Sequence, residues 1–560
     1  MRWLSKFLVL MTVLTLMASA GGSVGLAQEA SDEDIMTPYG KYPQPVYLTT
    51  GKRSDPTAEW PQGDNVDNNF FTRYCMEKIN AQTKTVWSVD ETAYIEKLTL
   101  DMASDNLPDI FSISNDDYLL FLTMVENDML ADLTEVYEKC ANWYLKDTAQ
   151  SFNFEHFEPY TIDGKLMGIP TGRYGYEHNM YWVRGDILDA LGMKSEDIRT
   201  LEDIENFLVK VKEKYPDKIP LALNYQDPLS NYGVSFSADP IAMLFGAQPR
   251  QWVYDADGSV VYGSTQPGMK DALAKLSDWY KRGLIDMEFA TRSGTGVMDA
   301  LTTSGEAVSW FAPWWFGWNV SDLYTNVEGA YVVPINAPLN DKGEYHVPWG
   351  PAAGSVMLIS KKCEHPEAAI KLLNIDFDMT RGFDEELTRQ WDNARDENNP
   401  DRLKVRMSQL EPGGINIEYN NVVPTFGHAV KAYIESGDMS GLSCPMEVSE
   451  TMMAAGYASG DPKYQDAYSR GVYLSRAVAA PMTDAENVVI HKPAFTQVTE
   501  SYSDLWPSLL SLERVAVLQT VMGERPVEEF DAFVAQWLEE GGQTLTDEIN
   551  EMVKARDALK

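Results

Sequence analysis

The chain has 560 residues, of which 44% are hydrophobic and 23% are charged, as is typical of a folded soluble protein. This length exceeds what a single hydrophobic core supports, so we expect at least two domains. The formal charge of −38 argues against sequence-independent binding to nucleic acid and against adhesion to an anionic membrane, because both depend on positive charge.

The N-terminus has the pattern of a secretory signal peptide. Arg2 and Lys6 precede the apolar stretch FLVLMTVLTLMASA, and the small residues Gly25 and Ala27 mark a cleavage site. The alternative is an uncleaved anchor, for which the apolar stretch is short. We therefore expect cleavage near Ala27, a flexible segment over 28–43, and a secreted or extracytoplasmic protein. No cysteine near the cleavage site offers a place for a lipoprotein's lipid.

Helix and strand patterns alternate in the first part of the chain. The apolar runs predict strands over 45–50 and 107–114 and helices over 92–106 and 115–130. Such alternation indicates an α/β fold with a parallel sheet, whose ligands bind beyond the carboxyl ends of the strands. SISNDD, residues 112–117, lies at such an end.

Later segments continue this pattern. Asp203 follows the candidate N-cap Thr200 at the third helical position, and DADG, residues 255–258, fits a hairpin turn. Further strands are predicted within 163–170, from 180 and over 218–225, and further helices up to Gly192, over 200–216 and 269–285, from Pro366 and over 528–542.

Motifs of known catalytic chemistry are missing or misplaced: GGSVG, residues 21–25, matches a nucleophile pattern but lies within the predicted signal peptide. None of the six histidines lies within four residues of another, so the sequence has no helical zinc pair, and it has no phosphate-binding loop. We assign no catalytic residue, metal ligand or cofactor. A carboxylate pair for glycoside hydrolysis stays open, because some pair among 84 acidic residues always lies close enough. The four cysteines are expected to be free or to form one optional disulfide.

Six aromatic rings gather in the nine residues WFAPWWFGW, 310–318. Pro313 and Gly317 interrupt the run, so it cannot form one regular helix. We therefore expect a wall of rings at the end of a strand. Each ring is either ordinary core or a ligand contact, because aromatic side chains bury a large area in both roles.

Several stretches, taken together and in order, resemble the solute-binding proteins of bacterial ABC importers. The resemblance is strongest to the carbohydrate-type family that includes the LipO-like and aldouronate-transport binding proteins. The matching stretches are ASDNLPDIF, DGKLMGIP, YWVRGDILDALG, WYKRGLIDMEFAT, SGEAVSWFAPWW, KKCEHPEAAIKLLN and MGERPVEEFDAFVAQWLEEGGQTLTDEIN, which run from 103 to 550.

This resemblance implies a periplasmic-binding-protein-like fold of the maltose-binding type, with two α/β lobes and a ligand cleft between them. Lobe one takes roughly 44–165 and 350–425, and lobe two takes roughly 166–349 and 426–560. The chain then crosses between lobes near DGKLMGIP and near VPWGPAAG. Many relatives are tethered lipoproteins, and this chain departs from them in lacking the lipid-bearing cysteine.

The resemblance also selects candidate ligand contacts. SGEAVSWFAPWW matches a segment whose tryptophan stacks on a sugar, which implies this role for Trp314, with Trp315 as an open case. Asp116, after the PDI strand, matches a carboxylate that holds a sugar hydroxyl, with a helix cap as the alternative, and Asn115 shares both expectations. Trp310, Phe311 and Phe316 are assigned to the core, and Trp318 is undecided.

Aromatic residues in turn-rich stretches complete the candidate site. Tyr174 and Tyr176 lie in GRYGYEHN, Tyr232 in SNYGVSF, Trp60 in AEWPQGDN and Trp349 in VPWGPAAG. Each is either a cleft contact or part of a surface loop or turn. Flat rings suit the apolar faces of pyranose sugars, and a few polar groups take the hydroxyls.

The function implied is capture of a carbohydrate, an oligosaccharide, by a monomeric binding protein that delivers it to the permease of an ABC importer. Two alternatives stay open. One is a binding protein for peptides or other non-sugar solutes, since aromatic clefts also suit hydrophobic peptides. The other is a secreted polysaccharide-degrading enzyme, which product formation from oligosaccharides would reveal.

Overall fold

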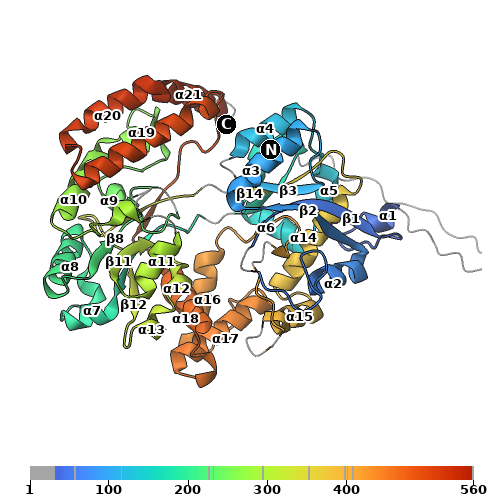
Figure 1. Cartoon of the computed structure of the whole chain (residues 1–560), viewed down its shortest axis with the longest axis horizontal. Helices are drawn as coiled ribbons and strands as arrows, with labels where there is room; N and C mark the ends of the chain where they lie inside the picture. Colours follow the sequence, from blue (N-terminus) through green and yellow to red (C-terminus); the bar gives the residue numbers. More distant parts are fainter. Residues whose placement is uncertain are drawn as a thin grey trace, which may run out of the picture.

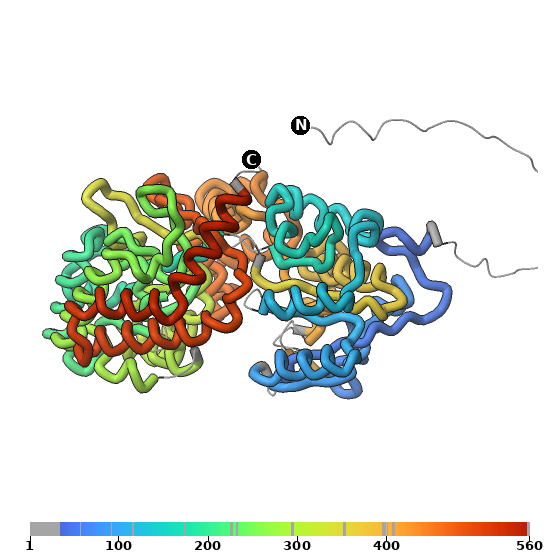
Figure 2. The backbone as a smooth tube through the Cα atoms, turned by 90° about the horizontal axis from the view of Figure 1, so that it is seen from above, coloured from blue at the N-terminus to red at the C-terminus, as the bar shows by residue number. Residues whose placement is uncertain are grey.

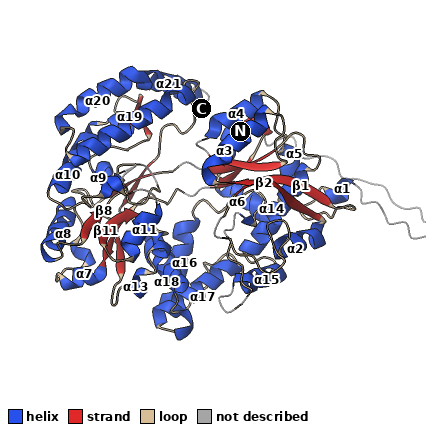
Figure 3. Cartoon of the chain, viewed as in Figure 1, coloured by secondary structure: helices blue, strands red, loops and turns tan. Residues whose placement is uncertain are grey.

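The computed structural model describes residues 32–557, except 56–57, 115–116, 173–174, 225–227, 231–232, 293–294, 351–352, 396–398, 400 and 406–408. The chain forms two bodies that lie side by side, each with helices packed around a β-sheet (Figures 1, 2 and 3). The predicted α/β class is therefore confirmed. The predicted signal peptide lies outside the described residues, among which no helix has the length and apolar character to cross a bilayer.

The first lobe is built on a five-stranded sheet with β3 in the middle of the order β2-β1-β3-β14-β6. Strands β2 and β3 run parallel to β1, whereas β14 is antiparallel to both of its neighbours. The strands are β1 (Val46–Arg53), β2 (Ala81–Val89), β3 (Ile110–Ser114), β6 (Ile169–Gly172) and β14 (Ala353–Ile359). The helices are α1 (Asp32–Ile35), α2 (Phe70–Ile79), α3 (Tyr94–Ala103), α4 (Tyr118–Glu126), α5 (Thr134–Cys140), α6 (Trp143–Ser151), α14 (Pro366–Thr380) and α15 (Glu385–Arg395).

Helices bury both faces of this sheet, and successive side chains of each strand point to opposite faces. In β14, Met357 and Ile359 join the core beneath α2, α5 and α14, while Val356 and Leu358 join the core beneath α3 and α4. Residues near Tyr42, within the segment expected to be flexible, pack against the first of these cores.

The second lobe is built on a four-stranded sheet of order β12-β7-β11-β8. Its strands are β7 (Met180–Arg184), β8 (Ile219–Ala222), β11 (Ala307–Ala312) and β12 (Val332–Ile335). Its helices are α7 (Gly185–Ala190), α8 (Leu201–Lys214), α9 (Asp239–Leu244), α10 (Pro267–Lys281), α11 (Thr295–Thr303), α12 (Phe316–Asn319) and α13 (Leu323–Asn326). Thr200 and Asp203 form the predicted capping box at the start of α8.

Two helical groups complete the second lobe. The first packs against the end of β11 and consists of α16 (Val422–Ser436), α17 (Pro445–Ser459), α18 (Ala467–Val472) and a π-helical turn, Tyr473–Ala479. The second packs on α10 and consists of α19 (Tyr502–Met522), α20 (Phe530–Trp537) and α21 (Gln543–Asp557). Gly541, with φ at 129°, ends the predicted helix over 528–542 by a kink that leads into α21.

A buried carboxylate attaches α19 to the second lobe. Glu513 is 0% exposed and accepts hydrogen bonds from the Tyr262 hydroxyl at 2.7 Å and the Ser264 hydroxyl at 2.8 Å. The Arg250 guanidinium adds an ion pair at 3.4 Å. Tyr262 lies on the hairpin β9 (Trp252–Tyr254)–β10 (Val260–Tyr262), whose turn is the predicted DADG. Its ring stacks on Trp537 of α20 at 4.7 Å.

The four cysteines are free and buried, which selects the first of the two expected states. Desolvation raises the pKa of all four thiols. Since the thiolate is the reactive form, these side chains act as small apolar core residues.

Candidate functional site

Three segments connect the lobes, and they lie next to one another. The first crossing follows Gly172 and reaches the second lobe by Tyr176, the second leaves β12 and enters β14, and the third follows Tyr419 and enters α16. A Cβ atom on Gly172 would lie 3.2 Å from the Glu418 carbonyl oxygen, so the first and third crossings leave the first lobe side by side.

The second crossing contains β13 (Tyr345–Pro348), which pairs in parallel with β15 (Val488–His491). The pair is fastened by a hydrogen bond between His346 Nδ1 and His491 Nε2 at 2.7 Å. Burial, followed by the neighbouring His346, lowers the pKa of His491. Trp349 follows directly, and its backbone N–H donates to the His491 carbonyl at 2.9 Å. The residue after β13 is therefore held in place by β15.

A cavity of about 500 Å³ opens between the lobes beside this crossing. Its volume lies within the usual range of small-molecule sites. The first lobe supplies Tyr118, Glu155, His156, Glu158 and Pro159; the crossing supplies Trp349 and Gly350; the second lobe supplies residues 492–498 together with Met552, Val553 and Arg556. Both lobes and one crossing therefore form its wall.

The aromatic side chain that the crossing contributes to this cavity is Trp349. A Cβ atom on Gly175 would lie 2.0 Å from Trp349 Cε2 and 2.2 Å from Cζ2, so the indole lies against the first crossing. Tyr176 contacts it edge-on, with the ring centroids 5.1 Å apart. The Lys492 ammonium lies 5.7 Å from its centroid. Both Tyr176 and Trp349 are half-buried, and the structure brings these two predicted site residues together.

Charged groups of both signs line the cavity. Glu155 and Glu158 are exposed on a 3₁₀ helix of the first lobe, and exposed Lys492 and Arg556 belong to the second lobe. Between them, His156 is buried, and desolvation lowers the pKa of His156 to about 4. The site therefore combines apolar ring surface with hydrogen-bonding groups, an arrangement that suits a polar ligand with apolar faces.

The aromatic run of residues 310–318 begins in β11 and continues past the end of that strand. Trp310, Phe311 and Phe316 are fully buried, as assigned. Trp314 is 2% exposed, and the Arg476 guanidinium lies 4.7 Å from its ring centroid. Arg476 is itself ion-paired with Glu450 at 3.0 Å. The Arg476 guanidinium therefore covers a face of the Trp314 indole on which a sugar would stack.

The other predicted contacts are distributed as follows. Trp315 is half-buried against the same core cluster as Trp314 and Tyr176. Trp60 is half-buried against the first-lobe core beneath α14. Asn115, Asp116, Tyr174 and Tyr232 lie outside the described residues.

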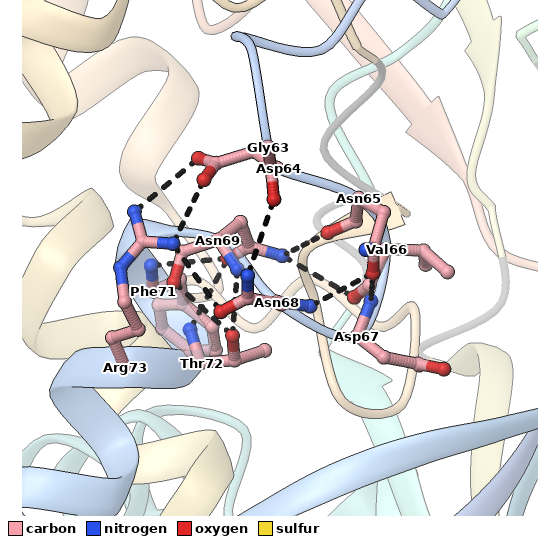
Figure 4. Close-up of polar contacts among 10 residues, drawn as sticks. All are labelled: Gly63, Asp64, Asn65, Val66, Asp67, Asn68, Asn69, Phe71, Thr72 and Arg73. Atoms are coloured by element: carbon pink, nitrogen blue, oxygen red, sulfur yellow. Dashed lines mark hydrogen bonds and ion pairs between the residues drawn. The ribbon is translucent and has the colours of Figure 1, made fainter.

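The loop that carries Trp60 leads from β1 to α2 and is fixed by its own polar contacts (Figure 4). Asn69 Oδ1 accepts from the backbone N–H groups of Phe71 and Thr72 at 3.0 and 3.1 Å, which caps α2. Arg73 pairs with Asp64 at 2.8 Å. These contacts give the loop a structural role. Within the described ranges, no group of three His, Cys, Asp or Glu side chains is arranged to hold a metal ion.

Sequence reasoning missed Gly175, Glu155, Glu158, Lys492 and Arg556. Gly175 stands beside Tyr176 in GRYGYEHN, so that stretch held a signal, but the close approach of a ring depends on the second crossing. The charged residues gave no local signal, because the residues that line the cavity come together only in the folded chain.

A buried carboxyl near the first crossing leads to a prediction about pH. Desolvation raises the pKa of Asp239 from 3.8 to about 7, against opposing hydrogen bonds from Asn179 and Ser237. At pH values between 3.8 and about 7, the folded state holds a proton on Asp239 that the unfolded state has lost. The contribution of Asp239 to folding stability therefore falls as pH rises. The free energy of unfolding of Asp239→Asn, taken relative to that of wild type, is expected to rise by about 1.4 kcal/mol per pH unit between about pH 5 and 7.

Urea unfolding of both proteins across this range checks the prediction. The difference between the two free energies of unfolding removes the contribution of other titrating groups. Parallel pH profiles for variant and wild type would contradict it.

Comparison with known proteins gives two kinds of likeness. The sequence pattern of the bacterial extracellular solute-binding proteins matches residues 76–376. A carbohydrate ABC transporter substrate-binding protein of Streptococcus pneumoniae is 25% identical over 182 residues. That match covers 30% of this chain and 33% of the relative.

Solved structures share the fold over nearly the whole chain. An alginate-binding protein is 16% identical, with 94% of this chain and 100% of that chain covered and a TM-score of 0.59. An S. pneumoniae ABC-transporter substrate-binding protein in complex with kestose is 14% identical, with 92% and 100% covered and a TM-score of 0.60. The two-lobe architecture expected from the sequence is confirmed by these likenesses.

Proposed function

The chain belongs to the bacterial extracellular solute-binding proteins, and we propose that it captures an oligosaccharide outside the cytoplasm and delivers it to the permease of an ABC importer. One observation carries the choice of ligand: the half-buried Trp349 ring lines a cavity to which both lobes contribute. The similar proteins include an alginate-binding protein, a substrate-binding protein in complex with kestose and a carbohydrate ABC transporter substrate-binding protein. These likenesses support the same ligand class.

The chemistry of the cavity suits a sugar. An indole face buries the apolar C–H face of a pyranose ring, with a gain on the order of 1 kcal/mol beyond area burial, by analogy with aromatic pairs. Carboxylates such as Glu155 and Glu158 accept hydrogen bonds from hydroxyls, and Lys492 donates them.

The remaining predicted contacts stay within this proposal. Trp315 borders the cluster that Tyr176 joins, whereas Trp314 meets ligand only after Arg476 has moved from its ring. We keep Asn115, Asp116, Tyr174, Tyr232 and Trp60 as candidate contacts of a longer ligand.

Binding works through closure of the lobes. Ligand bound to one lobe favours the closed form only through the contacts that the other lobe adds. In this scheme the first lobe runs from about 44 to Gly172 and returns for 353–419, since β6 pairs with β14. The protein acts as a monomer and performs no chemistry on the sugar.

A thermal-shift screen tests the ligand class. The probes are alginate oligomers, kestose, xylo-oligosaccharides and a set of peptides, each at about 100 times the expected Kd. A ligand specific to the folded state then stabilises it by about 2.7 kcal/mol. We expect a raised Tm with one class of oligosaccharide. A raised Tm with peptides alone would overturn the proposal, and shortened products after incubation with oligosaccharides would indicate an enzyme.

A further inference from the structure

The Trp349 side chain connects two crossings that belong to different parts of the hinge. Its backbone is fixed to the second lobe, because its N–H donates to His491 and its carbonyl accepts from Gln251 Nε2 at 3.2 Å. Its indole, however, rests on Gly175 of the first crossing. The ring therefore acts as a spacer between a segment held by the second lobe and the segment that leaves the first.

Only glycine permits this spacing. The 2.0 Å separation from the position of a Cβ atom on Gly175 to Trp349 Cε2 is far below any van der Waals contact, so a methyl group requires the ring or the crossing to shift. The edge-on contact of Tyr176 stands on one side of the indole. A shift of the ring is thus passed to the first crossing or to the cavity.

We propose that Gly175 is a positioning residue whose contact with the Trp349 indole sets the angle between the lobes and couples ligand at the cavity to their closure. Ligand stacked on Trp349 shifts a ring that already contacts the first crossing. Occupancy of the cavity therefore changes the geometry of the hinge. The coupling to ligand rests on the proposed function, whereas the effect on the angle does not.

The test compares Gly175→Ala with Gly296→Ala. Gly296 lies exposed on α11 with nothing within 4 Å of a Cβ atom, so it receives the same methyl group without a clash. Spin labels on Leu100→Cys in α3 and Met287→Cys in the second lobe, both exposed, report the distance between lobes without ligand. We expect Gly175→Ala to shift this distance distribution and Gly296→Ala to leave it unchanged.

A second-site variant shows whether the effect passes through the ring. Trp349→Phe offers a smaller ring, so Gly175→Ala combined with it is expected to restore the distance distribution of Trp349→Phe alone. If Gly175→Ala shifts the distance equally with either ring, or does not shift it at all, the proposal is wrong. Circular dichroism and Tm establish that each variant is folded.

Affinity separates the two proposals. With an oligosaccharide found in the thermal-shift screen, Gly175→Ala is expected to lose about tenfold in affinity, as one displaced stacking contact predicts. If no oligosaccharide binds but the distance still shifts, the hinge contact stands and the proposed ligand class fails. If oligosaccharide binds with unchanged affinity to Gly175→Ala, the coupling fails and the proposed function stands.

Discussion

Trp349→Ala is expected to reduce affinity for the oligosaccharide by at least about tenfold while the protein stays folded, since one stacking contact contributes on the order of 1 kcal/mol and area burial adds to it. The ring is half-buried at the wall of the cavity, so its removal opens no closed core. Isothermal titration calorimetry measures the affinity, and the Tm of the free protein measures the fold.

Trp314→Ala is the matched control, because it removes the same side chain from a buried position. At 2% exposure, its loss is expected to cost about 3–5 kcal/mol of folding stability. If Trp314→Ala weakens binding more than Trp349→Ala at a temperature where both are folded, Arg476 yields to the ligand and the stacking surface is Trp314.

Glu513→Ala is expected to lower the free energy of unfolding by about 3–5 kcal/mol, because removing one member of a buried ion pair leaves the opposite charge without its carboxylate. The side chain is 0% exposed and also accepts from Tyr262 and Ser264. Since it joins α19 to the second lobe, the loss is expected to release the C-terminal helices first.

Urea unfolding gives the free energy, and hydrogen exchange locates the region that opens. Tyr262 and Ser264 donate to different oxygens of the Glu513 carboxylate. Glu513→Gln keeps one of these two acceptors and is expected to lose less free energy of unfolding than Glu513→Ala. Equal exchange in α19 and α8 of the alanine variant would contradict the local release of the C-terminal helices.

Local signals predicted the elements well. The capping box of Thr200 and Asp203, the DADG hairpin and the strand that ends before Pro313 all depend on residues close in sequence, and the structure has each of them. The α/β class followed from their alternation.

The site was harder to predict because its parts are far apart in the chain. Trp314 was selected by its motif, yet its exposure depends on Arg476, which lies 162 residues later. Trp349 was identified only as a ring in a turn, and its setting depends on Gly175 and His491. Contacts between such distant segments leave no periodicity or spacing in the sequence.

The position of β14 has a consequence for synthesis of the chain. This strand lies between β3 and β6, yet it begins at Ala353, after all four strands of the other sheet. Until the ribosome has made it, the first sheet has two unpaired inner edges, which are prone to mispairing with other chains. The first sheet is therefore begun before the second sheet but completed only after all strands of the second sheet have been made. Its dependence on such distant contacts makes slow folding the expected behaviour.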